Sequence, residues 1–395
     1  MTVQRLVTGR SRLLLVGAGH AHLEILRRLA REPPGVELTV VSPAPLHHYS
    51  GMVPGFLQGT YSEEEIAVDV PRLAARSGGR FLAGTAVALD PARRAVHLAG
   101  GEEVTYDLVS FAVGSDTAGV EDPAVAGSVQ RIKPLARVTR LRERLFDLAG
   151  GGPQPVEGAE GADGADRAGA AAERRVAVVG GGAAGVEVAC AAEKVLASFG
   201  PGGRVMIVEA GADILSGYTA RCRRRARDIL AARGIAVKTA SPVAAVRADA
   251  VEIAGGGEIA SDLTIWLTGA VALPLFQGSG LPLDARGFLL VDGALRSLAD
   301  PRVFAAGDCG TLADHPDTPK AGVYAVREGP VLWQSLKAAL EGGPAPSYRP
   351  QKGFLSLLNT ADGRALLEYK GLVSHSRWAW RLKDAIDRRF LARYR

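Results

Sequence analysis

Two segments of the chain, 163 residues apart, share one order of elements: a short apolar strand, a glycine-rich turn, a helix and a second apolar strand. The first segment has its strand at 13–16 and its turn at 17–22, and the second has its strand at 176–179 and its turn at 180–185. Continuous apolar strands that alternate with helices require a parallel sheet covered by helices on both faces. The repeat therefore predicts an α/β protein with two dinucleotide-binding domains.

The second turn matches a phosphate-binding glycine pattern at three positions, Gly180, Gly182 and Gly185. In such a turn the glycines allow a tight bend, close approach of a pyrophosphate to the backbone, and close packing of the helix on the strand. Glu209 ends the following strand, where a carboxylate would hold a ribose 2′-hydroxyl and repel a 2′-phosphate. We therefore expect NAD at this turn, with NADH preferred over NADPH.

The first turn keeps Gly17 and Gly19 but has His22 at the position of the third glycine. The strand after it ends in Ser42 and Pro43 rather than in an acidic residue. The histidines at 20 and 22 are not completed to a metal-ligand set, so we expect them to pack or to donate and accept hydrogen bonds, and we expect no metal site.

A third pattern lies at 303–308, where an apolar strand ends in Gly307 and Asp308. The glycine permits close approach, and the carboxylate beside it suits the hydroxyls of a ribityl chain. Together with the first turn, this pattern indicates a second dinucleotide, which we expect to be FAD.

Composition excludes several other classes of protein. A chain with 47% hydrophobic and 23% charged residues is neither disordered nor fibrous. Its three widely spaced cysteines form neither a disulfide framework nor a CxxC site, which favours a reducing, cytoplasmic setting, and no apolar run is long enough to span a bilayer. The net charge of +5 comes from the last twenty residues, which hold seven Lys or Arg against two Asp, so we expect no nucleic-acid partner.

With these motifs the chain resembles the FAD-dependent pyridine nucleotide-disulphide oxidoreductase superfamily. Within it the chain is most similar to type II NADH dehydrogenase-like proteins, and segments 19–23 and 49–55 resemble a branch sometimes fused to selenophosphate synthetase. The resemblance implies two Rossmann-like domains, with the NAD domain inserted in the FAD domain. It implies FAD contacts at Gly17, Gly19, His20, Ser42, Pro43, Gly114, Gly307 and Asp308, and NAD contacts at Gly180, Gly182, Glu209 and Gly269.

We expect the FAD domain at 1–115 and 285–345 and the NAD domain at 116–284, with a flexible insertion at 150–174. A small C-terminal α+β module at 346–395 would contain a hairpin and a basic amphipathic helix. The apolar stripe of that helix is expected at Trp378, Leu382, Ala385, Ile386 and Phe390. This stripe fits docking on the FAD domain or on a second subunit, which we favour, or peripheral contact with the inner face of a membrane.

The resemblance implies an FAD-dependent NADH oxidoreductase, with hydride passing from NADH to flavin N5 and then to a quinone or another small acceptor. It places Glu187 close to the nicotinamide, and we expect Lys320, just before a helix that begins near 321, to stabilise the reduced flavin. The chain lacks the cysteine pair of disulphide reductases, and segment 322–328 lacks the glutamines found where quinone docks in type II dehydrogenases. A reductase of sulfur or selenium metabolism and a slow flavin-bound signalling protein therefore remain as alternatives.

Overall fold

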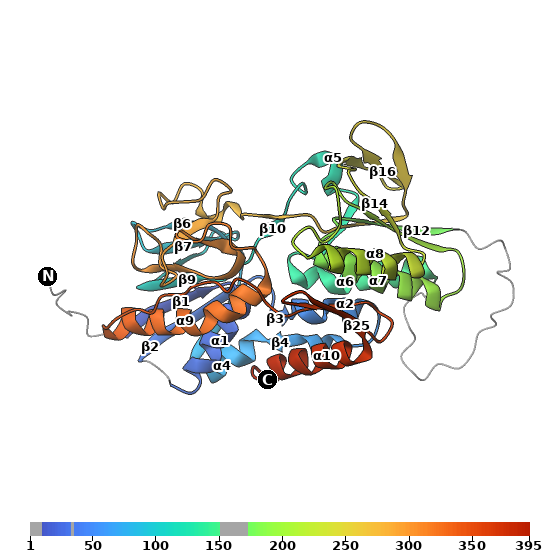
Figure 1. The fold of residues 1–395 in the computed structure, drawn as a ribbon. Helices are drawn as coiled ribbons and strands as arrows, with labels where there is room; N and C mark the ends of the chain where they lie inside the picture. Colours follow the sequence, from blue (N-terminus) through green and yellow to red (C-terminus); the bar gives the residue numbers. More distant parts are fainter. Residues whose placement is uncertain (1–9, 33–34, 151–172) are drawn as a thin grey trace, which may run out of the picture.

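The computed structural model describes residues 10–32, 35–150 and 173–395, which form two large domains and a smaller C-terminal module (Figure 1). The first domain is built on a five-stranded parallel sheet in the order β21-β9-β1-β2-β5. Four consecutive residues of β1, 13–16, are fully buried, as a strand covered on both faces requires. The strands are β1 (Ser11–Val16), β2 (Val36–Ser42), β5 (Gly79–Ala83), β9 (Leu108–Phe111) and β21 (Val303–Ala305).

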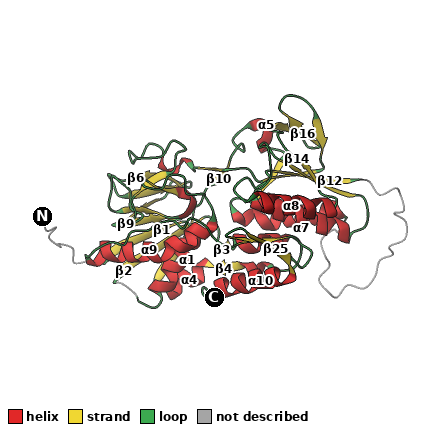
Figure 2. Ribbon diagram, in the orientation of Figure 1, coloured by secondary structure: helices red, strands yellow, loops and turns green. Residues whose placement is uncertain are grey.

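The second domain repeats this plan with a five-stranded parallel sheet in the order β11-β18-β12-β13-β14. Its strands are β11 (Val129–Arg131), β12 (Arg174–Val179), β13 (Gly203–Val208), β14 (Ala236–Lys238) and β18 (Leu263–Trp266). The helices α6 (Val138–Ala149), α7 (Ala183–Ser198) and α8 (Ala220–Ala232) lie together on one side of this sheet (Figure 2). The repeated strand–turn–helix pattern of the sequence therefore folds as two α/β domains, as expected.

Helices α1 (His20–Leu29) and α9 (Gly322–Glu341) pack against each other beside the first sheet (Figure 1). Their close approach depends on Gly329, where an added Cβ would come within 2.9 Å of the Cβ atom of Glu24. Glu24 itself is nearly buried and forms ion pairs with Arg27 and Arg28. The helix that packs on α1 thus comes from a segment that follows the second domain in the sequence.

The chain crosses between the two domains twice, and the two crossing segments pair as the antiparallel strands β10 (Asp116–Thr117) and β19 (Ala270–Val271). Immediately after β19, the short helix η3 (Pro274–Phe276) packs on the first domain, where the rings of Phe276 and Phe111 lie 4.9 Å apart. The chain therefore contacts the first domain again from Pro274 onward, before the expected boundary at 284. Most of the expected insertion, 151–172, lies outside the described residues, and Arg174 belongs to β12 rather than to the insertion.

The two domains also contain four small sheets and several short helices. The sheets contain β3 (Leu46–His48) with β4 (Ala67–Asp69); β6 (Ala86–Asp90), β7 (Ala95–Leu98) and β8 (Glu103–Thr105); β15 (Val243–Val246), β16 (Ala250–Ile253) and β17 (Glu258–Ala260); and β20 (Leu289–Val291) with β22 (Gly310–Leu312). The short helices are η1 (Ser50–Met52), α2 (Val53–Leu57), α3 (Glu63–Ile66), α4 (Val70–Arg76), α5 (Pro123–Ala126), η2 (Leu135–Arg137) and η4 (Gly307–Cys309).

The C-terminal module consists of three antiparallel strands rather than the single expected hairpin, followed by helix α10 (Arg377–Leu391). The strands are β23 (Ser356–Asn359), β24 (Ala365–Tyr369) and β25 (Leu372–Ser376). The module touches both domains: the Tyr218 hydroxyl is 2.9 Å from the Ser356 hydroxyl, and Tyr61 donates to Asp384 at 2.7 Å. It therefore bridges the second domain and the first.

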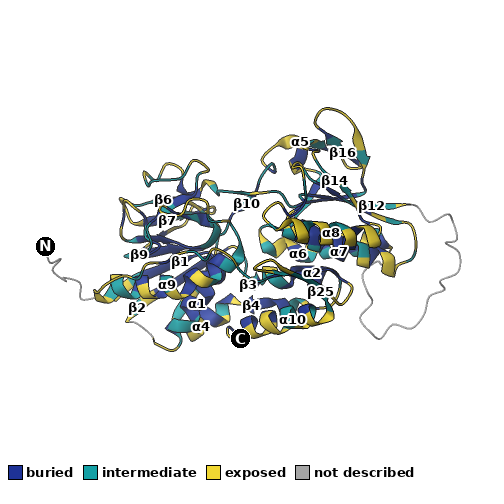
Figure 3. Ribbon diagram, in the orientation of Figure 1, coloured by how far each residue is buried: buried dark blue, intermediate teal, exposed yellow. Residues whose placement is uncertain are grey.

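Helix α10 docks on the rest of the chain, but not through the stripe expected from the sequence. Its buried residues are Ala379, Asp387, Phe390 and Leu391. Of the expected stripe only Phe390 is buried, whereas Trp378 and Ile386 are 64% and 43% exposed. The outer side of α10 is accordingly exposed in Figure 3. None of the described helices is long and apolar enough to cross a membrane.

Candidate functional site

The first glycine turn lies between β1 and α1, against the end of β9. Gly17 has a φ of +84°, and a Cβ on either Gly17 or Gly19 would come within 2.5 Å of the carbonyl oxygen of Ala112. No side chain caps the first turn of α1, so its N-terminal N–H groups remain available to an anion. A glycine cradle that faces an uncapped helix N-terminus fits the pyrophosphate of a dinucleotide.

His22, at the position of the third glycine, has its side chain within hydrogen-bond distance of the turn and of the neighbouring strand. Its ring nitrogens lie 2.6 Å from the Gly17 carbonyl oxygen and 2.9 Å from the Ser110 hydroxyl, and burial lowers its pKa to about 4. His20, two residues earlier, is also buried with a pKa near 4, and its Nε2 atom has no hydrogen-bond partner among the described residues. An unpartnered buried nitrogen at the start of α1 fits a role of His20 in binding a ligand at this turn.

The second glycine turn has the same construction. An added Cβ would lie 2.3 Å from the Leu267 carbonyl oxygen at Gly180, and 1.9 Å from the Gly180 carbonyl oxygen at Gly185. Helix α7 begins at Ala183, and its N-cap residue, Gly182, likewise provides no side-chain cap. The Glu209 carboxylate faces this turn and accepts hydrogen bonds from the backbone N–H groups of Gly181, at 2.5 Å, and Gly211, at 2.6 Å.

Asp308 lies where the first domain meets the chain entering the second. Its Oδ2 atom accepts hydrogen bonds from the Ser115 hydroxyl, at 2.8 Å, and from the Lys133 ammonium group, at 3.1 Å. The Lys133 ammonium group also donates to the Ser115 hydroxyl, at 2.6 Å. Neither Ser115 nor Lys133 follows from a sequence motif, because both reach Asp308 through contacts across more than 170 residues.

Lys320 and Glu328 flank the same Gly307–Asp308 turn. The Lys320 ammonium group donates to the Gly310 carbonyl oxygen and the Thr311 hydroxyl and lies 4.2 Å from the centre of the Phe288 ring, and burial lowers its pKa. The Glu328 carboxylate is buried, accepts the Gly307 N–H, and has its pKa raised by burial to about 7. Lys320, Glu328 and Asp308 line one small pocket beside the N-terminus of α9.

Glu187, on α7, lies where the two domains and the C-terminal module meet. Its carboxylate accepts the backbone N–H of Asn359 at 2.7 Å. Burial raises its pKa to about 7, although the positive charge of Lys383 on α10 acts in the opposite direction. Lys383 forms an ion pair with Asp387 at 2.7 Å and donates to the Gly51 carbonyl oxygen. Three parts of the chain thus bring a titratable carboxyl group and a buried ammonium group together.

The remaining expected contacts lie at strand ends that face the two glycine turns. Ser42 ends β2 and is buried, and Pro43 follows it. Gly114, with a φ of +75°, leads into β10, and Gly269 leads into β19. The three cysteines, Cys190, Cys222 and Cys309, are buried free thiols, and burial raises their pKa values to about 12, 12 and 11.

Two glycine cradles on adjacent domains, joined by two short crossings, are typical of flavin- and pyridine nucleotide-dependent oxidoreductases. The chain belongs to the pyridine nucleotide-disulphide oxidoreductase family, whose model matches residues 11–333. Both the expected superfamily and the expected α/β class are therefore confirmed.

Curated relatives bear oxidoreductase names. A demethylphylloquinone reductase of Synechocystis is 28% identical over 264 residues, which cover 64% of this chain and 60% of the relative. An NADH dehydrogenase-like protein of Mycobacterium tuberculosis is 27% identical over 312 residues, or 75% of this chain and 72% of the relative. A type II NADH:quinone oxidoreductase of Haemophilus influenzae is 32% identical over 148 residues, covering 35% of this chain and 33% of the relative. The match thus spans less than two thirds of the first of these relatives.

Solved structures share the fold. NDH2 of Plasmodium falciparum in complex with NADH superposes with a TM-score of 0.79 at 15% identity, covering 98% of this chain and 97% of that one. The sulfide:quinone oxidoreductase of Aquifex aeolicus gives 0.78 at 16% identity, covering 98% and 91%. Because the superpositions cover nearly the whole chain, the C-terminal module is part of the shared architecture.

Proposed function

We propose that this chain is an FAD-dependent NADH dehydrogenase that passes electrons to a quinone at a membrane surface. The observation that carries the proposal is the pair of glycine cradles, each placed between a buried strand and an uncapped helix. Bound FAD supplies the hydride chemistry, accepting a hydride at N5 from the nicotinamide and releasing electrons to an acceptor. The chain's own residues bind, orient and exchange protons.

The first cradle would hold FAD. Gly17 and Gly19 admit the pyrophosphate, and Asp308 offers its carboxylate to the ribityl hydroxyls. Ser115 and Lys133 both engage the Oδ2 atom of Asp308, which fixes the direction of that carboxylate. Lys320 lies beside the start of α9, so its charge and the helix dipole both favour negative charge on a reduced flavin.

The second cradle would hold NADH in preference to NADPH. Its Glu209 carboxylate already faces the N–H groups of the turn, in the position of a ribose 2′-hydroxyl partner. A 2′-phosphate would bring a second negative charge against this carboxylate, with no arginine at 210 or 211 to offset it.

A quinone acceptor is favoured by two observations. The relatives named above include a demethylphylloquinone reductase and a type II NADH:quinone oxidoreductase. Helix α10 also carries an exposed apolar row, Trp378 and Ile386, among exposed arginines. Such a surface suits an anionic bilayer, in which quinones dissolve. A sulfur or selenium acceptor has no comparable support among these named relatives.

Glu187 would exchange a proton during turnover. A carboxyl group with a pKa of about 7 is nearly half protonated at neutral pH, and two-electron reduction of a quinone consumes two protons. The nearby Lys383 ammonium group favours the ionised state that follows proton release.

An acceptor screen tests the proposal. Purified protein saturated with FAD should oxidise NADH in the presence of a short-chain quinone, faster than with sulfur or selenium compounds or with oxygen. NADH oxidation that is equally slow with every acceptor would contradict it and would favour a slow signalling protein.

A further inference from the structure

A basic groove lies between helix α8 of the second domain and strand β25 of the C-terminal module. It is lined by Arg221, Arg224, Arg225 and Asp228 from the helix and by Ser374 and His375 from the strand. Three arginines face one carboxylate, so the groove carries an excess of positive charge. None of its lining residues belongs to either glycine cradle.

The arginines of α8 fall into two groups. Arg223 and Arg227 both form ion pairs with Asp213, at 3.0 and 2.7 Å. By contrast, the three groove arginines are exposed and have no carboxylate within ion-pair distance in the described part of the chain. Their side chains are therefore free to bind an anion from outside.

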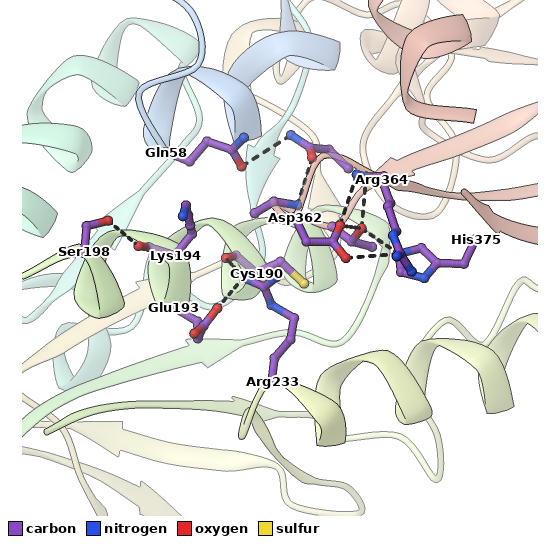
Figure 4. Close-up of polar contacts among 12 residues, drawn as sticks. Gln58, Cys190, Glu193, Lys194, Ser198, Arg233, Asp362, Arg364 and His375 are labelled. Carbon is purple, nitrogen blue, oxygen red and sulfur yellow. Dashed lines mark hydrogen bonds and ion pairs between the residues drawn. The ribbon is translucent and has the colours of Figure 1, made fainter. Parts of the chain in front are cut away.

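On the side of the groove formed by β25, His375 is held by partly buried polar contacts, and Figure 4 shows it beside Asp362. The His375 Nε2 atom is 2.9 Å from the Thr360 hydroxyl, which donates to Asp362 at 2.6 Å. Burial lowers the pKa of His375, and the charges of Arg225, Arg233 and Arg364 lower it further, against the effect of Asp362. Of the three groove arginines, Arg225 is close enough to His375 to contribute to this lowering.

The position of the groove indicates where such an anion comes from. Strand β25 runs from Leu372 to Ser376, and α10 continues directly with Trp378 as its second residue. Leu372 and Trp378, 62% and 64% exposed, are the two most exposed large apolar side chains of the described chain. The groove residues Ser374 and His375 lie between them in sequence. A bilayer surface that received both apolar side chains would lie close to the groove, because strand β25 carries Leu372 as well as the groove residues Ser374 and His375.

We propose that this groove binds the phosphate of an anionic phospholipid headgroup, and so orients the second domain on the membrane. The proposal rests on the membrane attachment in the proposed function, and it adds a specific lipid class and a site outside α10. Charge complementarity and continuity with the exposed apolar residues select a lipid phosphate over a free one. Each Arg close to an anionic surface strengthens binding about fivefold, so the three together act on the order of a hundredfold.

The test compares three holoproteins in vesicle co-sedimentation: wild type, a groove variant (Arg221→Gln, Arg224→Gln, Arg225→Gln) and a matched control. The control, Arg137→Gln with Arg140→Gln and Arg144→Gln, removes the same charge from exposed positions of the same domain. Vesicles consist of phosphatidylcholine alone or with about one-third phosphatidylglycerol. FAD content and circular dichroism verify that all variants are folded.

We expect the wild type and the control to bind anionic vesicles at least tenfold more tightly than the groove variant does, while all three bind neutral vesicles alike. Equal losses in the groove variant and the control would overturn the proposal, because the effect would then be one of net charge. No loss in either would overturn it as well.

Two further arms separate the possible failures. The double variant Trp378→Glu, Ile386→Glu should no longer bind neutral vesicles. If the wild type bound neutral and anionic vesicles equally, the groove would not be a lipid-phosphate site, but the proposed membrane attachment would stand. Wild type that binds no vesicles would refute both. A thermal shift of wild type, absent from the groove variant, on addition of inorganic phosphate alone would identify the site as one for free phosphate and overturn the lipid assignment.

Discussion

Replacing Glu187 by Gln should make the protein more stable at alkaline pH while leaving its stability in acid nearly unchanged. The Glu187 carboxyl group is held between α7 and the C-terminal module, where its only described hydrogen bond comes from the Asn359 N–H. Burial raises its pKa from 4.5 to about 7, since the ionised form loses water that one N–H and the nearby Lys383 charge replace only in part.

The magnitude follows from this shift. Below pH 4.5 the group is protonated in both the folded and the unfolded chain, so its ionisation does not change the free energy of unfolding. Between pH 4.5 and 7 the unfolded chain releases the proton and the folded chain retains it, so stability is lost as pH rises through this window. A shift of about 2.5 units corresponds to at most about 3 kcal/mol. The glutamine variant lacks this titration and keeps that stability above pH 7.

Thermal unfolding of the FAD-saturated proteins at pH 5 and pH 8.5 measures the effect. The melting temperature of Glu187→Gln relative to wild type should rise by several degrees between the two pH values. Glu143→Gln, at an exposed position of α6, is the matched control and should show no such change. If the difference between Glu187→Gln and wild type were the same at both pH values, the raised pKa and the packing that causes it would be refuted.

Three further predictions concern the cradles and the cysteines. Asp308→Ala should bind FAD at least tenfold more weakly in apoprotein reconstitution, because the ribityl contact is lost; unchanged FAD occupancy would refute that contact. The kcat/KM of the wild type should be about thirtyfold higher with NADH than with NADPH, equivalent to about 2 kcal/mol, and Glu209→Ser should reduce this ratio. The same ratio in both proteins would show that Glu209 does not determine the preference. NADH oxidation should survive simultaneous Cys→Ser substitution at Cys190, Cys222 and Cys309, because burial keeps all three thiols protonated. A triple variant that binds FAD but no longer oxidises NADH would contradict this.

The elements that the sequence predicts best are those determined by local patterns. The sequence predicts strands at 13–16 and 176–179, and these residues lie within β1 and β12, because a buried parallel strand is a continuous apolar run. The carboxylate of Glu209 faces the second turn for a similarly local reason, since the strand that carries it pairs with the strand that leads into the turn.

Long-range contacts were not predictable in the same way. Lys133 joins Asp308 across 175 residues, and the Glu187 carboxylate meets Asn359 across 172, with no spacing rule that links either pair. The apolar spacing of helix α10 predicts the wrong buried face because the helix has apolar residues on two faces. The row with the clearer spacing, which includes Trp378 and Ile386, faces outward, while Asp387 is buried because Lys383 and Tyr49 satisfy it.

Anaerobic rapid mixing of the FAD-loaded protein with NADH, followed by a second mixing with vesicles that contain a quinone, tests the central claim most directly. We expect NADH to remove the visible absorbance of the flavin in one fast phase, and quinone-containing vesicles to restore it while quinone-free vesicles do not. A flavin that NADH leaves oxidised would contradict the assignment of the two cradles. A reduced flavin that quinone vesicles fail to reoxidise would contradict the proposed acceptor.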